Sequence, residues 1–283
     1  MKVLVTGAGG QLGYDLCRTL SERKLEYTGV CSAGVDVTDR EAVRDCVKSC
    51  RPDAVIHCAA YTAVDRAEDE TARCWAVNVE GTRNVALACR EFHAKMVYIS
   101  TDYVFSGSGE HFYRPEDPTE PLNFYGKSKR EGERVVQTLL ELFFIVRTSW
   151  LFGSNGSNFV KKMLSLTQPE ADVVCDQVGS PTYTRDLARL LCDMVMTDKY
   201  GVYHASNEGV CSWAEFAEEI FRQTGADIKV NFIPSSQYPT RAVRPFNSRM
   251  DKGKLETAGF SRLPPWQSAL RRYLSHQTLK ERK

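Results

Sequence analysis

The sequence carries almost no excess of either charge. Its 283 residues include 37 Lys and Arg against 36 Asp and Glu, a formal net charge of +1 at pH 7. A chain so balanced has no overall field that would attract nucleic acid or a membrane surface. We therefore expect no nucleic-acid partner and no membrane partner. An anionic ligand would have to be bound by charges placed at one site.

The sequence also lacks the residue spacing of a metal site. It has ten cysteines but no Cys-x-x-Cys pair, and the closest two, Cys46 and Cys50, have no histidine beside them. The cysteines are scattered through a chain that is long enough to form a core without disulfides. We predict reduced, mostly buried thiols and no bound metal.

Long apolar runs are missing as well. No segment approaches the length of a membrane span. The first strand-like run meets glycine at Gly7, which leaves no room for the apolar core and cleavage site of a signal peptide. The expected location is the cytoplasm.

The first half of the sequence alternates short apolar runs with amphipathic stretches, the pattern of parallel strands covered by helices on both faces. The final third is richer in turns. The expected fold is α/β: a Rossmann-type doubly wound parallel sheet with a smaller, interwoven C-terminal substrate-binding lobe. The strand candidates are Lys2 to Thr6, Leu25 to Val30, Ala54 to Cys58, Met96 to Ser100 and Phe143 to Arg147.

The expected division places residues 1–150 in a dinucleotide-binding domain, which also receives part of 183–210. Residues 151–182 and 211–283 would form the substrate-binding lobe. The tail at 280–283, Lys-Glu-Arg-Lys, is expected to be a frayed, solvated end.

Two local signals refine this outline. Thr38 is followed three residues later by Glu41, the pattern of a capping box that begins a helix running towards Cys50. The stretch Ser106 to Asn123 holds two glycines and three prolines, which predicts a long loop. Loops of that length are usually functional, and this one should border the site because it ends beside Tyr125.

A glycine-rich turn follows the first strand candidate. Gly7, Gly10 and Gly13 have the spacing GxxGxxG, and a helix-like run begins at Leu12. Small residues let the backbone approach a pyrophosphate, and the unpaired amides of a helix start donate to its charge. The setting predicts a dinucleotide site, with a tight turn that binds no ligand as the alternative.

No acid marks the end of the second strand candidate. Val30 to Gly34 contains no charge, so the choice between NADH and NADPH stays open. Asp36 and Val37 follow shortly after. They would meet the edge of the adenine ring, or Asp36 would be a solvated aspartate before a helix.

Tyr125 and Lys129 are four positions apart, so on a helix they share one face. Lowering the pKa of a phenol from near 10 to about 7 requires roughly 4 kcal/mol. One cation at about 4 Å, with an effective dielectric constant near 20, supplies a similar amount. The pair therefore predicts an acid that protonates a substrate carbonyl, although a chance pair on an exposed helix would look the same.

Ligands of open parallel sheets bind beyond the carboxyl ends of the strands. This rule places two further segments at the expected site, Ala59 to Thr62 and Ser100 to Tyr103. Thr101 would lie opposite Tyr125, and its hydroxyl would bond the substrate oxygen that Tyr125 protonates. The alternative is that Thr101 is an ordinary turn residue after a strand.

Longer motifs give a resemblance that runs from Met1 to about Leu270. On these motifs the sequence resembles the extended short-chain dehydrogenase/reductases and, more narrowly, the dTDP-4-dehydrorhamnose reductase family. The most specific motifs are Asp-Gln-x-Gly-x-Pro-Thr at 176–182 and Arg-Pro-x-Asn-Ser at 244–248. The others are Gly7 to Gly13, Ala59 to Asp65, Ser100 to Phe105, Pro121 to Lys129 and Arg147 to Trp150.

The resemblance implies reduction of the C4 ketone of dTDP-4-dehydro-6-deoxy-L-mannose by NADPH or NADH, giving dTDP-L-rhamnose. It implies Tyr125 as the proton donor, Lys129 as the residue that binds the nicotinamide ribose and lowers the pKa of the phenol, and Thr101 as a third catalytic candidate. The cofactor-binding candidates are Gly7, Gly10, Gln11, Leu12, Gly13, Asp36, Val37, Ala60, Tyr61, Thr62 and Ile99, with Tyr125 and Lys129. The substrate-binding candidates are Thr101, Asp102, Trp150, Tyr238, Arg241, Arg244 and Asn247.

Other functions within this resemblance stay open. Nucleotide-sugar 4,6-dehydratases follow the same threonine with an Asp-Glu pair, whereas Tyr103 follows Asp102 here, which favours simple reduction. Another nucleotide-sugar short-chain reductase is a second alternative. A third is a non-catalytic regulatory subunit like the methionine adenosyltransferase β subunit, against which the retained Tyr125 and Lys129 argue.

The resemblance also bears on metal binding and on assembly. Some family members are described as dimers bridged by magnesium through acidic residues. Only Asp15 lies near an expected ligand position in this sequence. We therefore predict no metal, and either a monomer or a homodimer.

Overall fold

The computed structural model describes residues 1–281, and it describes side-chain surroundings as far as His276. Arg282 and Lys283, the end of the tail expected to be solvated, lie outside the described residues. In the part of the chain that is described, no helix has both the length and the apolar character needed to cross a bilayer. All ten cysteines fall within that part and are free thiols.

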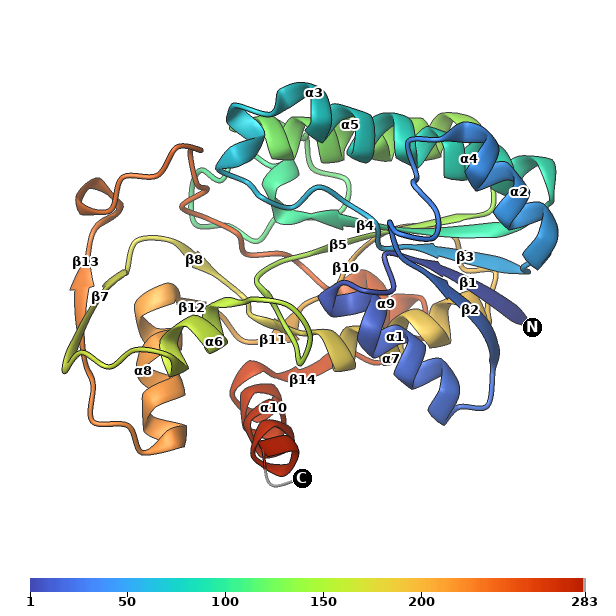
Figure 1. Ribbon diagram of the computed structural model, residues 1–283. Helices are drawn as coiled ribbons and strands as arrows, with labels where there is room; N and C mark the ends of the chain where they lie inside the picture. Colours follow the sequence, from blue (N-terminus) through green and yellow to red (C-terminus); the bar gives the residue numbers. More distant parts are fainter. Residues whose placement is uncertain (282–283) are drawn as a thin grey trace.

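A sheet of six parallel strands forms the centre of the molecule, in the order β10-β5-β4-β3-β1-β2 (Figure 1). The order reverses between β1 and β3, which is the switch point where open α/β sheets bind ligands. The expected doubly wound α/β fold is confirmed. The strands are β1 (Lys2–Thr6), β2 (Glu26–Val30), β3 (Ala54–His57), β4 (Lys95–Thr101), β5 (Phe143–Thr148) and β10 (Gly201–His204).

Helices cover both faces of this sheet (Figure 1). One face carries α2 (Arg40–Cys50), α3 (Thr71–Trp75), the π-helical segment η2 (Ala76–Gly81), α4 (Thr82–Glu91) and α5 (Phe124–Leu139). The other carries α1 (Gln11–Glu22), α7 (Thr184–Val195) and α9 (Gly253–Thr257). Helix α1 packs against α7, and Leu16 and Leu191 from these two helices are fully buried.

A smaller second part lies beside the sheet, on the left in Figure 1. Its core combines Phe152, Phe216, Ile220 and Tyr273, all buried. Its helices are α6 (Phe159–Leu164), α8 (Trp213–Thr224) and α10 (Trp266–Glu281). Its short strands are β6 (Leu151–Phe152), β7 (Glu170–Val174), β8 (Val178–Gly179), β9 (Thr182–Tyr183), β11 (Asn207–Glu208), β12 (Cys211–Ser212), β13 (Lys229–Ile233) and β14 (Leu263–Pro265).

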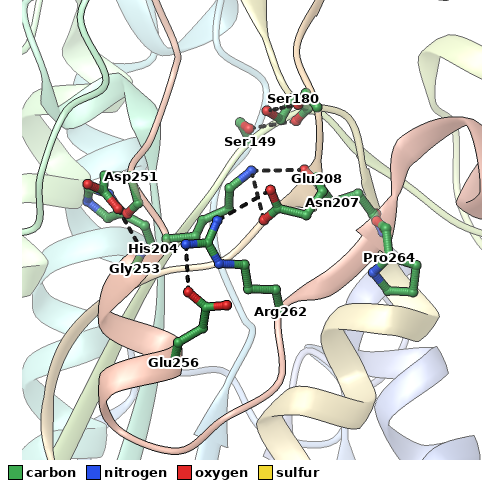
Figure 2. Close-up of polar contacts among 12 residues, drawn as sticks. Ser149, Ser180, His204, Asn207, Glu208, Asp251, Gly253, Glu256, Arg262 and Pro264 are labelled. Carbon is green, nitrogen blue, oxygen red and sulfur yellow. Dashed lines mark hydrogen bonds and ion pairs between the residues drawn. The ribbon is translucent and has the colours of Figure 1, made fainter.

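Polar contacts join the segment after β10 to the chain before α10 (Figure 2). Arg262 donates to Glu256 at 2.7 Å and forms an ion pair with Glu208 at 3.5 Å. The Asn207 side chain donates to the Pro264 carbonyl at 2.8 Å. These contacts fix the strand pair β11-β14, which leads into α10.

Local predictions are partly right. The capping box at Thr38 is wrong: Asp39 is the N-cap of α2, and its carboxylate accepts from the amides of Glu41 and Ala42, both at 3.0 Å. The Thr38 hydroxyl donates to Asp36 instead. The stretch 106–123 is a loop, in which Tyr113 forms an isolated β-bridge.

Candidate active site

One large cavity of about 720 Å³ lies beyond the carboxyl ends of the central strands. Four parts of the chain line it: the glycine-rich turn, the ends of β3, β4 and β5, the start of α5, and loops of the second part. The lining includes Gly7, Gly10, Gln11, Leu12, Gly13, Ala60, Thr62, Ile99, Thr101, Asp102, Tyr103, Tyr125, Lys129, Trp150, Asn158, Trp213 and Arg244. Most of the site residues predicted from the sequence therefore meet at one place.

The glycine-rich turn brings the backbone close to β3. Gly7 has φ +67°, and a Cβ at this position would lie 2.6 Å from the Ala59 amide nitrogen. Glycine is therefore required there. Helix α1 begins at Gln11, with Gly10 at its N-cap. The first amides of a helix have no carbonyl partner within it, and this arrangement binds phosphate oxygens.

A loop of the second part reaches the same turn. The Asn155 side chain donates to the Gly9 carbonyl at 2.6 Å, and the Asn158 side chain donates to Gln11 Oε1 at 3.1 Å. Asn158 also caps α6 through the Lys161 amide at 3.0 Å. Sequence reasoning missed both asparagines, because no local spacing links them to a turn about 146 residues away.

Tyr125 lies in the first turn of α5. Asn123 caps this helix, and its Oδ1 accepts from the Gly126 amide at 2.8 Å. Thr101, which ends β4, lines the same cavity. Burial raises the pKa of Tyr125 above its ordinary value, the negative charge of Asp102 raises it further, and the Thr101 hydroxyl acts in the opposite direction. The phenol is thus protonated at neutral pH.

Lys129 lies one turn further along α5 and is 3% exposed. Its ammonium lies over the Tyr98 ring, 4.1 Å from the centroid. Burial lowers the pKa of Lys129 to about 7, and the charge of Glu133 acts against this shift. Burial is the largest influence on the pKa of Tyr125, and the expected lowering of that pKa by Lys129 stays a prediction.

Asp102 is a buried carboxyl group at the cavity wall, 4% exposed. Burial raises its pKa to about 6, while hydrogen bonds from Ser248 and Thr101 lower it. The next residue, Tyr103, also lines the cavity, and its ring meets Tyr125 edge-on with centroids 5.9 Å apart.

Arg244 is the arginine of the cavity lining. Its guanidinium donates to the Tyr103 hydroxyl at 3.1 Å and pairs with Asp65. The Asp65 carboxylate also accepts from the Ala242 amide at 3.1 Å. These contacts hold the segment from Ala242 to Arg244 against the loop after β3.

Trp150 and Trp213 form a stacked pair in the cavity wall, with ring centroids 3.7 Å apart and planes at 13°. Trp150 has φ +50°, a conformation that costs a non-glycine residue energy and recurs at functional sites. A Cβ on Gly179 would lie 3.0 Å from the Trp150 indole, so this glycine makes room for the ring. Trp213 was not predicted from the sequence.

Three cofactor candidates lie outside the cavity lining. The Asp36 carboxylate bonds the Thr38 amide at 2.9 Å, and Val37 is buried against Gly81. The Tyr61 amide donates to Asn78 at 2.8 Å. Their roles in cofactor binding stay predictions.

Three substrate candidates also lie outside the lining. Arg241 forms an exposed ion pair with Asp69 at 2.8 Å. Tyr238 is 44% exposed. Asn247 is buried, and its side-chain amide donates to the His111 carbonyl at 2.8 Å. This contact fixes the loop before α5.

Known proteins with related sequences agree with this architecture. Residues 1–279 match the family model described as RmlD substrate binding domain. The chain belongs to the RmlD family. One relative of this RmlD-family chain is a dTDP-4-dehydrorhamnose reductase of Streptomyces griseus, 45% identical over 276 residues, 94% of this chain and 91% of the relative.

Two further proteins are informative. A dTDP-4-keto-6-deoxy-D-glucose reductase of Streptomyces niveus is 37% identical to the RmlD-family chain over 94% of each. The crystal structure of dTDP-4-dehydrorhamnose reductase from Bacillus anthracis in complex with NADP superposes with a TM-score of 0.95, at 41% identity, and covers 97% of this chain and 99% of that one. The resemblance found in the sequence motifs is confirmed.

Metal binding is considered for the side chains that the structure describes, residues 1–276. Among them, no group of three or more His, Cys, Asp or Glu side chains is placed to hold a metal ion. Asp15, the residue near an expected magnesium ligand, is 1% exposed and accepts a hydrogen bond from the Thr184 hydroxyl.

Proposed function

We propose that this protein reduces the C4 ketone of dTDP-4-dehydro-6-deoxy-L-mannose with NADPH or NADH, giving dTDP-L-rhamnose in the last step of dTDP-rhamnose synthesis. The observation that carries the proposal is that the Tyr125 phenol, Lys129 and the glycine-rich turn line one cavity. Relatives with the name of this reductase at 40% identity and above support the substrate.

The glycine-rich turn fits a dinucleotide. Gly7 has no space for a side chain, and the backbone from Gly10 to Leu12 lines the cavity at the start of α1. Ala60, Thr62 and Ile99 extend the same wall to Lys129, the candidate for binding the nicotinamide ribose. When bound, the reduced nicotinamide supplies the hydride that the protein itself cannot supply.

Tyr125 is the proposed acid. Its phenol is protonated at neutral pH because burial and Asp102 raise its pKa. It gives its proton to the substrate oxygen as negative charge develops there. Asp102 and Trp150, which line the cavity, are the proposed sugar contacts, and Arg244 is the proposed contact to the anionic part of the substrate.

Tyr103 supports reduction over dehydration. Dehydration requires a carboxylate base at this position, whereas the Tyr103 hydroxyl accepts a hydrogen bond from Arg244 at 3.1 Å. The position therefore offers no base that would remove a proton from carbon.

The proposal includes both NADPH and NADH as the cofactor. The end of β2 is Val30-Cys31-Ser32, with no carboxylate to bind the ribose hydroxyl of NADH or to repel a 2′-phosphate. The NADP complex of the Bacillus anthracis relative supports NADPH.

We propose that cofactor binding and substrate binding belong to different parts of the chain, divided at the edge of the central sheet. Residues 1–150 would bind the cofactor together with the part of 183–210 that returns as α7 and β10, and residues 151–182 and 211–283 would bind the substrate. The parallel pairing of β10 with β5 supports this assignment. We propose a monomer or a homodimer in the cytoplasm, without a metal.

A related 4-ketoreductase activity is the second candidate. The Streptomyces niveus relative acts, by its name, on dTDP-4-keto-6-deoxy-D-glucose. Comparison of the two sugars as substrates separates the candidates, and preference for the D-glucose sugar would replace the first proposal by the second.

Turnover by the purified protein tests the proposal. Reduced nicotinamide should be consumed when dTDP-4-dehydrorhamnose is generated in the assay, and NMR should identify dTDP-L-rhamnose as the product. A non-catalytic regulatory subunit would bind the cofactor and show no turnover with any of these sugars, and that result would contradict the proposal.

A further inference from the structure

The face of the Tyr98 ring lies beneath the Lys129 ammonium, whose nitrogen is 4.1 Å from the ring centroid. Among the residues that the structure describes, no carboxylate or carbonyl accepts a hydrogen bond from this nitrogen. Lys129 lines the cavity, whereas Tyr98 is fully buried and lies outside the lining. The Tyr98 ring therefore reaches the cavity by way of Lys129.

Helix α5 holds the Tyr98 ring in place from above the sheet. The Tyr98 hydroxyl donates to the Lys129 carbonyl at 3.3 Å. Gly132 lies in the interior of the same helix, where glycine is a weak helix former. A Cβ on Gly132 would overlap the Tyr98 hydroxyl. The space that the ring needs under α5 therefore explains the glycine.

The other face of the Tyr98 ring is covered by an uncharged group. The His57 ring stacks on it, with centroids 6.0 Å apart and planes at 25°. His57 is itself fixed by the hydroxyls of Thr6 at 2.8 Å and Thr82 at 3.3 Å. Burial lowers the pKa of His57 to about 3, and the charge of Lys129 acts in the same direction. His57 is therefore neutral at neutral pH and does not repel the ammonium.

An aromatic face is an unusual support for a buried ammonium. A lysine has three N–H donors, and a carboxylate or carbonyl beneath it would accept from at least one of them. A ring face attracts the positive charge as a whole and does not require an N–H to point along one line. The ammonium can therefore be held over Tyr98 while its N–H groups turn towards the cavity.

We propose that Tyr98 is a positioning residue for cofactor binding: its ring face holds the Lys129 ammonium, in its charged form, at the cavity wall, and leaves the N–H groups to donate to the hydroxyls of the nicotinamide ribose. The inference rests on the proposed reductase function, which places that ribose beside Lys129. Tyr98 itself touches neither cofactor nor substrate, and no bond to it forms or breaks in the reaction.

The other titratable groups around Lys129 come from three elements. Glu133, one turn further along α5, raises the pKa of Lys129 and is paired with the buried Arg147 at 2.7 Å. Cys58 after β3 and Cys74 of α3 act in the same direction as Glu133. Burial raises the pKa of both thiols, so they are neutral at neutral pH. Because burial outweighs these charges, loss of the ring face should lower the pKa of Lys129 further.

Tyr98→Leu tests the inference, with Phe144→Leu as the matched control. Phe144 of β5 is also a fully buried ring, but it packs in the core of Leu16 and Leu191 on the other face of the sheet. In Tyr98→Leu the acid dissociation constant of Lys129 should rise by about tenfold, and the Kd of NADPH by a similar factor. Both variants should lose stability, but Phe144→Leu should leave the Lys129 titration and the Kd unchanged.

Tyr98→Phe separates the ring face from the hydroxyl. It keeps the face under the Lys129 ammonium and removes the group that donates to the Lys129 carbonyl. We expect a lower unfolding midpoint, with the Lys129 titration and the Kd of NADPH within about twofold of the wild type. A merely structural role would instead give losses of affinity that follow the unfolding midpoint in every variant.

Lys129 can be followed directly by NMR of the ligand-free protein with isotope-labelled lysine, and Lys129→Met identifies its signal. This titration requires neither cofactor nor turnover, so it separates failure of the inference from failure of the reductase function. In steady-state kinetics, Tyr98→Leu should raise KM for NADPH and change KM for the nucleotide-sugar little. The basic limb of kcat/KM for NADPH should move to lower pH, because the ammonium loses its proton more easily.

The inference is overturned if Lys129 in Tyr98→Leu titrates at or above its wild-type pH, or if Phe144→Leu weakens NADPH binding as much as Tyr98→Leu does. If Tyr98→Leu does not fold, Tyr98→Met takes its place, because methionine fills an irregular space and has no ring face. The same changes are expected in Tyr98→Met. An unmoved Lys129 titration in that variant would equally overturn the inference.

Discussion

The Lys129 ammonium lies 4.1 Å from the centroid of the Tyr98 ring, which is fully buried. The ring face attracts the cation, but it does not replace the water that the ammonium has lost. This is why burial lowers the pKa of Lys129 to about 7. From helical spacing alone, we expected the Lys129 ammonium to lie beside the Tyr125 phenol.

Lys129→Met should stabilise the fold at neutral and acid pH while abolishing turnover. The lysine titrates at 10.5 when unperturbed and at about 7 here, so between these values the unfolded chain binds more protons and stability rises with pH. The cost of burying the ammonium is fully present below about pH 7 and disappears above the unfolded pKa. The unfolding midpoint should rise more at about pH 6 than at about pH 9.

Lys127→Met is the control for this prediction. Lys127 lies on the exposed side of the same helix. Its replacement should give no gain in stability that depends on pH. Equal losses of stability by Lys129→Met at both pH values would show that the ammonium is well compensated in the folded protein.

Arg244 and Arg241 should differ in their effect on substrate binding. Arg244 lines the cavity, whereas Arg241 pairs with Asp69 on the surface. Arg244→Met should raise KM for the nucleotide-sugar by about tenfold or more, because a buried charged contact is lost. Arg241→Met should change KM little. A larger effect at Arg241 would place the anionic group of the substrate outside this cavity.

Part of this site could be read from the sequence because its signals are local. The turn from Gly7 to Gly13 follows a strand directly, and Tyr125 and Lys129 lie one helical turn apart. Strand ends such as Thr101 were located from alternation of apolar runs and then from the rule that ligands bind beyond the carboxyl ends.

The rest depends on contacts between distant segments. Trp213 lines the cavity stacked on Trp150, and the Asp102 carboxylate accepts from Ser248, which lies 146 residues away in the sequence. The pKa of Lys129 depends on burial beneath the cavity, which helical spacing does not reveal. The N-cap of α2 was misplaced by one residue because Asp39 competes with Thr38 for the same amides.

Gly179→Ala should disturb the Trp150 indole. The added Cβ would lie 3.0 Å from the indole and 3.0 Å from Ser248 Cβ. Overpacking of this kind costs about 1–3 kcal/mol. We expect a lower unfolding midpoint and a higher KM for the nucleotide-sugar. Gly34→Ala, whose Cβ would lie 3.7 Å from its nearest neighbour, is the control. Identical behaviour of the two variants would argue against a fixed Trp150.

Cys31→Asp should shift the cofactor preference towards NADH. Cys31 is exposed at the end of β2, beside Gly9 of the glycine-rich turn. A carboxylate there can accept from the adenosine ribose hydroxyl and repel a 2′-phosphate. The ratio of kcat/KM for NADPH to that for NADH should fall by on the order of tenfold. Cys31→Ser is the uncharged control. An unchanged ratio in Cys31→Asp would place the adenosine ribose elsewhere.

The central claim is that Tyr125 protonates the C4 ketone of a dTDP-linked sugar. The measurement that tests it most directly compares turnover of dTDP-4-dehydrorhamnose by the wild type and by Tyr125→Phe, with cofactor binding measured on both. We predict dTDP-L-rhamnose from the wild type, and a Tyr125→Phe variant that binds cofactor normally but is slower by about 10²–10⁴-fold. A Tyr125→Phe variant that turns over at nearly the wild-type rate would contradict the account.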